Sequence, residues 1–208
     1  MNVGRMPLFV SQPSFDASAT ALGDGRLAAV RDGDAEALED LLHELLPDVR
    51  RWLLRLLGPR ADVDDATQDA LIELAKALPN FEGRARLRTF AHRVTVRVAY
   101  RYYKRRARHG EVREDIDIED HDDPEARLIE RQALARLHEA LDTLPEKRRV
   151  AFVLCCIDGL TPTEAATVAG SSGLAMRSRL HHARAAIEKQ LRDDPAFGAW
   201  LTSGGTTR

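Results

Sequence analysis

Apolar side chains recur at helical spacing along most of the chain, with breaks at residues that end helices. The first run spans about residues 24–58 and ends at Gly58-Pro59, a pair that commonly follows a helix. Pro47 lies inside this run, so the sequence predicts a kink there or the start of a second half. A second helix is expected over about residues 62–78, with Pro79-Asn80 closing it. The aspartates in its first turns suit the positive end of the helix dipole.

A third helix, expected over about residues 85–108, has two contrasting sides. One side is apolar, and the other is basic, with cations spaced by three, four or seven residues. The apolar positions are Leu87, Phe90, Ala91, Val94 and Val98, and the basic positions are Arg86, Arg93, Arg97, Arg101, Lys104 and Arg108. Tyr100, Tyr102 and Tyr103 are interleaved with the basic residues. Their rings either stack on unpaired bases, as in single-strand binders, or pack on the protein core.

The last part of the chain has the pattern of a helix-turn-helix preceded by two helices. Leucines mark a helix that ends near Leu144-Pro145, and the next apolar run ends at Gly159. Thr161-Pro162-Thr163-Glu164 is a capping box that begins a short helix ending at Gly170. Ser171 or Ser172 caps the final helix. Its predicted buried face is Met176, Leu180, Ala183, Ile187 and Leu191.

Composition supports a helical protein of two small domains. The chain has 208 residues, of which 44% are apolar and only 5% aromatic, and this balance favours helices over sheets. No apolar run approaches the roughly 20 residues of a membrane span, and the N-terminus lacks a signal peptide, so a cytoplasmic protein without membrane insertion is expected. Cys155 and Cys156 are adjacent, without further metal ligands at suitable spacing, so core packing is the expected role and no metal or cofactor is predicted.

Charge is distributed in blocks, although the net charge is only −2. Residues 1–83 contain 8 Lys/Arg and 15 Asp/Glu, whereas residues 84–109 contain ten Lys/Arg and no acid. Residues 110–126 contain nine acids and one Arg, and residues 127–192 contain eleven Lys/Arg and seven acids. Ten cations without acids repel one another in a free protein and are expected to face a polyanion, with binding that weakens steeply with salt.

The final helix suggests a second nucleic-acid contact. With its apolar face inward, the outward positions early in this helix include Arg177, Ser178, His181, His182 and Arg184. In a helix-turn-helix the second helix lies in the major groove, where Arg can bind guanine through two hydrogen bonds. An ordinary helical hairpin with a solvated basic face is the alternative interpretation.

Two groups of segments resemble one family. RDGDAEALEDLLHELLP, DVDDATQDALIEL and FEGRARLRTFAHRV, followed by an Arg-rich helix, resemble region 2 of extracytoplasmic-function (ECF) sigma factors of bacterial RNA polymerase. LDTLPEKRRVAFVLCCIDGLTPTEAATVAG, followed by SRLHHARAAIEKQL, resembles their region 4. The likeness covers about residues 27–108 and 134–191, in the family's order.

The resemblance implies an all-α fold and a division into parts. These are a disordered extension (1–23), region 2 (24–108), an acidic flexible linker (109–126), region 4 (127–192) and a C-terminal tail (193–208). It implies that the chain is no enzyme, that core RNA polymerase and promoter DNA are its partners, and that an anti-sigma factor is its usual regulator.

The resemblance also implies roles for individual residues. Core polymerase would contact Asp64, Asp65, Gln68 and Asp69. The −10 element, which is opened and held as a single strand, would contact Arg86, Arg88, Phe90, Arg93, Arg97, Tyr100, Arg101 and Lys104. The −35 element would contact Ser172, Arg177, Ser178, Arg179, His181, His182 and Arg184. No catalytic residue is implied.

Several positions depart from the family pattern. Phe90-Ala91 replaces a common Trp-Leu pair, Arg97 stands where an Asn is frequent, and His182 stands where an Arg commonly follows His181. These departures predict unusual promoter preferences. A helix-turn-helix regulator that binds duplex DNA without polymerase is the alternative function, and it leaves the basic block at 84–108 unexplained. An enzyme is disfavoured, because the sequence has no Walker loop, no metal-spaced His/Cys cluster and no nucleophile–base signature.

Overall fold

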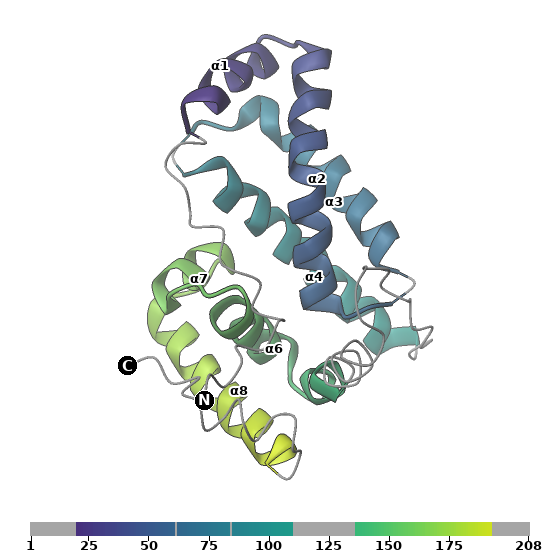
Figure 1. The fold of residues 1–208 in the computed structure, drawn as a ribbon, viewed down its shortest axis with the longest axis vertical. Helices are drawn as coiled ribbons and strands as arrows, with labels where there is room; N and C mark the ends of the chain where they lie inside the picture. Colours follow the sequence, from purple (N-terminus) through teal and green to yellow (C-terminus); the bar gives the residue numbers. More distant parts are fainter. Residues whose placement is uncertain (1–19, 61, 84, 110–135, 193–208) are drawn as a thin grey trace, which may run out of the picture. The chain divides into compact units, whose positions relative to one another are not determined.

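The computed structural model describes residues 20–60, 62–83, 85–109 and 136–192. Within these ranges all regular secondary structure is helical, which confirms the predicted all-α class. The chain divides into two compact units, one containing α1 to α4 and the other containing α6 to α8 (Figure 1). The predicted acidic linker from residue 110 onward, the tail at 193–208 and most of the N-terminal extension lie outside the described residues.

The first apolar run forms two helices rather than one, α1 (Thr20–Arg31) and α2 (Ala35–Leu57). The break is at Gly33, whose φ of +90° is readily adopted only by glycine. Asp34 then caps α2, since its carboxylate accepts the backbone N–H of Glu36 at 3.0 Å and of Ala37 at 3.1 Å. Asp32-Gly33 is a turn signal in the sequence, which the analysis of apolar spacing did not use. Residues 20–23, assigned to the disordered extension, are helical.

Pro47 does not start a new helix, because α2 continues through it; a kink at this position stays a prediction. The helix runs on to Leu57, and Gly58, with a φ of +81°, ends it where the Gly-Pro pair predicts. Pro47 cannot donate a hydrogen bond to the carbonyl of His43, four residues earlier, and both residues are exposed.

The first unit is a bundle in which α2 packs on both α3 (Val63–Ala77) and α4 (Leu87–His109), and α3 also packs on α4 (Figure 1). A short 3-10 turn, Leu78–Asn80, closes α3 at the predicted proline. The core is aliphatic, and it includes the fully buried Val49, Leu53, Leu56, Leu74, Leu78 and Val98.

Arg106 joins the three helices at one end of this bundle. Its Nε donates to Asp62 Oδ2 at 3.0 Å, its Nη2 donates to Asp62 Oδ1 at 2.5 Å, and its Nη1 donates to the Leu57 carbonyl at 3.0 Å. The pair is largely buried, with 11% and 21% of the two side chains exposed. This fork-shaped contact satisfies a carbonyl at the end of α2 and a carboxylate at the start of α3 together.

The second unit has helical residues at 136–142, followed by α6 (Glu146–Phe152) and a π-helical turn at Val153–Ile157. α7 (Pro162–Val168) begins with the predicted capping box, in which Glu164 N–H donates to Thr161 Oγ1 at 3.3 Å. In return, Thr161 N–H donates to Glu164 Oε2 at 2.8 Å. Gly170 makes the turn with a φ of +60°.

α8 (Gly173–Leu191) is capped by Ser172, whose Oγ accepts Ala175 N–H at 3.2 Å. All five residues predicted for its buried face are buried, and this face packs on α6. Arg149 and Asp142 form a buried ion pair at 2.8 Å that ties the preceding helical residues to α6.

Candidate nucleic-acid interface and partner-binding surface

The first candidate surface is the polar side of α3. Asp64 and Asp65 are exposed there as neighbours, and Gln68 is exposed about one turn later. Arg50 Nε lies 3.3 Å from Asp64 Oδ1. Asp69 differs from them, because it is half-buried and accepts the hydroxyl of Tyr102 at 3.0 Å. Burial of Tyr102, together with this hydrogen bond to Asp69, raises the pKa of the phenol to about 12. The structure therefore leaves three of the four predicted polymerase-binding residues exposed, although Asp64 pairs with Arg50, and it uses Asp69 in the fold.

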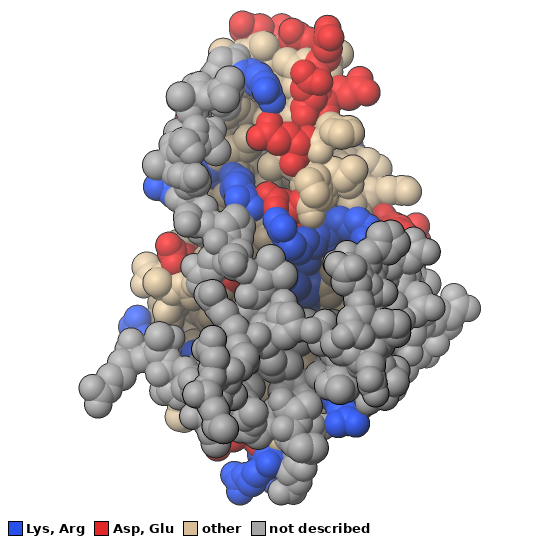
Figure 2. Space-filling model, in the orientation of Figure 1, with Lys and Arg blue, Asp and Glu red and all other residues tan. Residues whose placement is uncertain are grey.

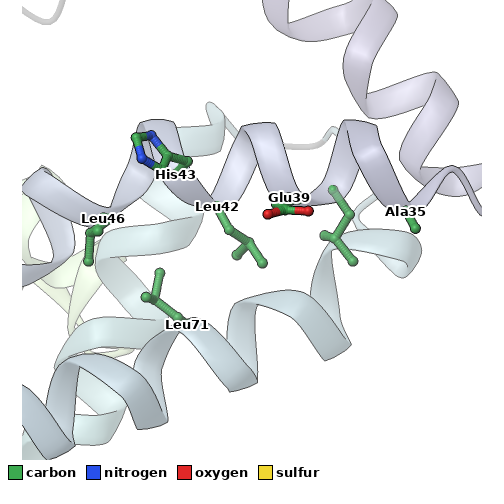
Figure 3. A pocket seen from close by; sticks show the side chains of 7 residues that line it. Ala35, Glu39, Leu42, His43, Leu46 and Leu71 are labelled. Atoms are coloured by element: carbon green, nitrogen blue, oxygen red, sulfur yellow. The ribbon is translucent and has the colours of Figure 1, made fainter.

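An open apolar groove of about 340 Å³ lies between α2 and α3 in the same unit. Figure 3 shows Leu42, Leu46 and Leu71 pointing into the space between the two helices, with Glu39 at its edge. Ile72, on the next position of α3, is 51% exposed. Sequence analysis did not single out this groove, because leucines at helical spacing are equally expected in a buried core.

Acidic side chains gather around the α1–α2 turn and the start of α2, at the top of Figure 2. The exposed acids of this segment are Asp32, Asp34, Glu36, Glu39, Asp40 and Glu44. The groove is therefore bordered by negative charge on its α2 side.

The second candidate surface is the basic side of α4. All six cations predicted to share this side are exposed: Arg86, Arg93, Arg97, Arg101, Lys104 and Arg108. The cations of this block nevertheless repel one another less than the sequence indicates, because acidic side chains of α2 and α3 form ion pairs with two of the arginines at 84–109. Arg88 pairs with Asp48 at 2.6 Å, and Arg101 pairs with Glu73. Among the described residues, Arg97, Lys104 and Arg108 form no ion pair.

The tyrosines of α4 belong mainly to the fold. Tyr102 and Tyr103 are buried, and Tyr103 donates its hydroxyl to the Leu56 carbonyl at 2.5 Å. Tyr100 is half-buried and meets Tyr103 edge-on, with ring centroids 6.3 Å apart. Packing on the core, the alternative kept open from the sequence, holds for Tyr102 and Tyr103. Phe90 is half-buried against Phe81, with centroids 4.7 Å apart.

A stacked pair behind the basic side was missed by sequence analysis. The rings of Trp52 and His92 are parallel within 7°, with centroids 4.1 Å apart. His92 is only 3% exposed, and burial, with added repulsion from Arg55 and Arg88, lowers its pKa to about 3. His92 is therefore neutral at physiological pH and acts as an aromatic core residue. Arg88 also contacts this pair: its guanidinium carbon lies over the Trp52 ring, 5.9 Å from the ring centroid.

The third candidate surface is the start of α8. Arg177, Ser178, His181 and His182 are exposed as predicted, and Arg179 is half-buried. Arg184 departs from the prediction: it is half-buried, and its Nε lies 3.4 Å from Cys156 Sγ. The helix turns this position partly toward the π-helical turn, so Arg184 packs on Cys156, and its contact with the −35 element stays a prediction.

The two cysteines pack within the second unit. Cys156 is buried, Cys155 is half-buried, and both are free thiols. Burial raises the pKa of Cys155 to about 12 and also raises that of Cys156, so neither is a reactive thiolate. No group of three metal-ligating side chains occurs in the described ranges. None of the helices described is long and apolar enough to cross a membrane.

Comparisons with known proteins assign both units. The Sigma-70 region 2 family matches residues 41–109, and the Sigma-70 region 4 family matches residues 134–187. The ECF RNA polymerase sigma factor SigE of Mycolicibacterium smegmatis is 30% identical over 192 residues, which cover 88% of this chain and 69% of that protein. The chain belongs to the ECF sigma factors. It directs RNA polymerase to promoters for transcription initiation and is not itself an enzyme.

Solved structures agree with this assignment of the sigma factor. CnrH in complex with the cytosolic domain of CnrY matches with a TM-score of 0.59 and 26% identity over 81% of this chain and 96% of that one. The sigma factor RpoE in complex with the anti-sigma factor NepR from Bartonella quintana has the same fold, with a TM-score of 0.58 and 22% identity over 75% of this chain and 99% of that one. The family resemblance drawn from the sequence is therefore confirmed.

Proposed function

We propose that this sigma factor divides promoter recognition between two helices and contacts core polymerase through α3. In this proposal, residues 24–108 bind core polymerase and the −10 element, and residues 127–192 bind the −35 element. The observation that supports it most is the exposed basic side of α4, where Arg97, Lys104 and Arg108 have no ion-pair partner among the described residues.

Asp64, Asp65 and Gln68 are the proposed polymerase contacts. They are exposed within the first two turns of one helix, so their spacing is fixed before binding. The groove with Leu42 and Leu71 lies on the same pair of helices and adds an apolar area to this surface. A partner helix with apolar and basic side chains would complement it.

The basic side of α4 is the proposed −10 surface, comprising Arg86, Arg93, Arg97, Arg101 and Lys104, with Tyr100 and Phe90 at its border. Arg97 and Lys104, which form no ion pair among the described residues, would neutralise phosphates and release counterions. The partly exposed rings offer a limited stacking area for a base that has left the duplex. Melting of the −10 element and capture of such a base are part of this proposal.

The start of α8 is the proposed −35 surface, with Arg177, Ser178, His181 and His182 facing the major groove. Arg179 lies at its border, and Ser172 contributes mainly by capping the helix. Arg177 is the residue suited to paired hydrogen bonds with guanine.

An anti-sigma protein is the proposed regulator, in the cytoplasm, where the family acts. The sigma factor RpoE of Bartonella quintana was solved with such a protein. The acid-bordered groove between α2 and α3 would accept a helix with an apolar face and basic flanks. Competition between a bound anti-sigma protein and core polymerase for this sigma factor would test the idea.

Reconstitution with core polymerase tests the division of labour. The Asp65→Ala, Gln68→Ala double variant is expected to lose co-elution with core polymerase, whereas Glu188→Ala, an exposed acid late in α8, keeps it.

Arg97→Ala and Lys104→Ala are each expected to lower the salt slope of promoter binding by about one, while Lys189→Ala, also exposed, leaves it unchanged. Tight duplex binding by the chain alone, without any contribution from core polymerase, would instead favour a conventional helix-turn-helix regulator.

A further inference from the structure

A large apolar side chain stands at the tip of α8. Among the described residues, the large apolar side chains that are markedly exposed are Ile72 and Leu174, and Leu174 is the more exposed, at 73%. Leu174 is the second residue of α8. A single exposed leucine on a protein surface has no meaning by itself. The position of Leu174 is informative, because the first turns of a recognition helix contact base edges.

Leu174 lies on the same side of the helix as the polar residues of the −35 surface. Arg177, Ser178 and His181 follow it by three, four and seven residues, and all three are exposed. The buried side of α8 begins with Met176 and Leu180, so Leu174 makes no contribution to that core face.

The Arg177 side chain lies close to the start of α8. A Cβ built at Gly173 would lie 3.6 Å from Arg177 Nη1. The guanidinium group therefore folds back over the first turn of α8, the turn that contains Leu174. One apolar group and one two-pronged hydrogen-bond donor are thus presented together.

The major groove offers one apolar group to such a side chain. Thymine is the base that presents a methyl group there, on C5, whereas guanine presents the O6 and N7 acceptors that bind Arg. A leucine next to an arginine is chemically complementary to a thymine methyl group next to a guanine.

We propose that Leu174 is a specificity-determining residue that contacts the C5-methyl group of a thymine in the −35 element, in the base pair adjacent to the guanine bound by Arg177. The proposal rests on the proposed role of α8 at the −35 element. Arg, Ser and His contacts supply hydrogen bonds, and Leu174 adds discrimination for thymine through burial of its side chain against the methyl group.

Methyl deletion in the DNA tests this contact. Full-length protein is assembled with core polymerase, and a preferred promoter is selected from fragments with a randomised −35 element. Each thymine of the selected element is then replaced singly by deoxyuridine, which lacks the methyl group. Wild-type holoenzyme is expected to lose about fourfold in affinity at one thymine, the size expected for one buried methyl group.

The variants identify the protein side of the contact. Leu174→Ala is expected to weaken binding to the thymine-containing promoter by a similar or larger factor and to show no further loss with deoxyuridine at that position. Leu174→Met, which keeps an apolar chain of similar volume, retains the deoxyuridine effect. Because Leu174 is exposed, both variants are expected to fold normally, as judged by unchanged thermal unfolding.

Two results would overturn the proposal in distinguishable ways. If Leu174→Ala keeps the wild-type response to deoxyuridine at every thymine, Leu174 is not the contacting residue, although α8 still recognises the −35 element. If selection shows no −35 preference and Arg177→Ala leaves promoter binding unchanged, the proposed role of α8 fails and the Leu174 proposal fails with it.

Discussion

α4 and α8 are both basic helices, yet they combine packing with charge in different ways. On α8, the five buried residues form one apolar face, and most of the proposed DNA contacts lie outside it. On α4, several charged or polar side chains are themselves structural: Arg106 holds Asp62, Tyr102 holds Asp69, and His92 stacks on Trp52. Counting cations therefore describes the binding surface of α8 better than that of α4, where part of the charge is used internally.

Arg106 is the strongest test of this difference. We expect Arg106→Ala to destabilise the first unit by about 3 kcal/mol or more, because it leaves the partly buried Asp62 carboxylate and the Leu57 carbonyl without their partner. Urea unfolding followed by Trp52 fluorescence, in a Trp200→Phe background, measures the loss.

Lys104→Ala is the matched control for Arg106→Ala, since Lys104 is an exposed cation on the same helix without an ion pair among the described residues. It is expected to change stability by less than about 0.5 kcal/mol while weakening DNA binding. Equal destabilisation by the two variants would contradict a structural role specific to Arg106.

His92 makes the first unit sensitive to acid. Its pKa is about 3 in the fold and 6.5 in its absence, so the unfolded chain takes up a proton first as the pH falls. The contribution of neutral His92 is fully present above pH 6.5 and is lost progressively from there toward pH 3. Between pH 7 and pH 5 the expected loss is about 2 kcal/mol, from 1.36 kcal/mol per pH unit.

The His92→Phe variant isolates this effect, because an uncharged ring replaces the imidazole against Trp52. As the pH falls from 7 to 5, wild type is expected to lose stability that the variant keeps. The unfolding free energy of the variant therefore rises relative to that of wild type over this range. His43→Phe, at an exposed position, is the control. A wild-type pH dependence that survives in His92→Phe would show that other groups cause it.

Arg177 and Arg184 show how function and packing are separated along α8. Arg177→Ala is expected to cost about 1–3 kcal/mol of discrimination at one −35 base pair and to leave stability almost unchanged, since its side chain is exposed. Arg184→Ala is expected to lower stability and to leave the −35 sequence preference unchanged, because its guanidinium group packs against Cys156. Promoter selection with holoenzyme and thermal unfolding separate the two; loss of sequence preference in Arg184→Ala would place it back among the DNA contacts.

Much of the fold followed from local rules. The capping box at Thr161, the cap at Ser172 and the buried face of α8 were predicted because each depends on residues close in sequence. The Gly33 turn was missed because apolar spacing alone was followed there, although Asp32-Gly33 is a turn signal and Gly33 adopts a positive φ.

The candidate surfaces were predictable as segments but not at every residue. Asp69, Arg88, Arg101 and Arg184 were each assigned to a binding surface, and each interacts within the protein. Asp69, Arg88 and Arg101 have partners from another helix, 33, 40 and 28 residues away, a distance that helical periodicity does not address. The Trp52–His92 stack had no local signal for the same reason.

Substitution of Ser172 is expected to have the smallest effect, because Ser172 belongs both to the predicted −35 surface and to the N-cap of α8. Its Oγ accepts Ala175 N–H, so Ser172→Ala is expected to cost about 1 kcal/mol of stability. Ser172→Asp restores the cap and is expected to recover that stability, but its negative charge next to DNA weakens promoter binding. If Ser172→Ala, at equal folded fraction, binds the promoter as wild type does, the hydroxyl acts through the helix cap. A loss that persists at equal folded fraction would make Ser172 a DNA contact as well, and α8 would then share the dual use of side chains found on α4.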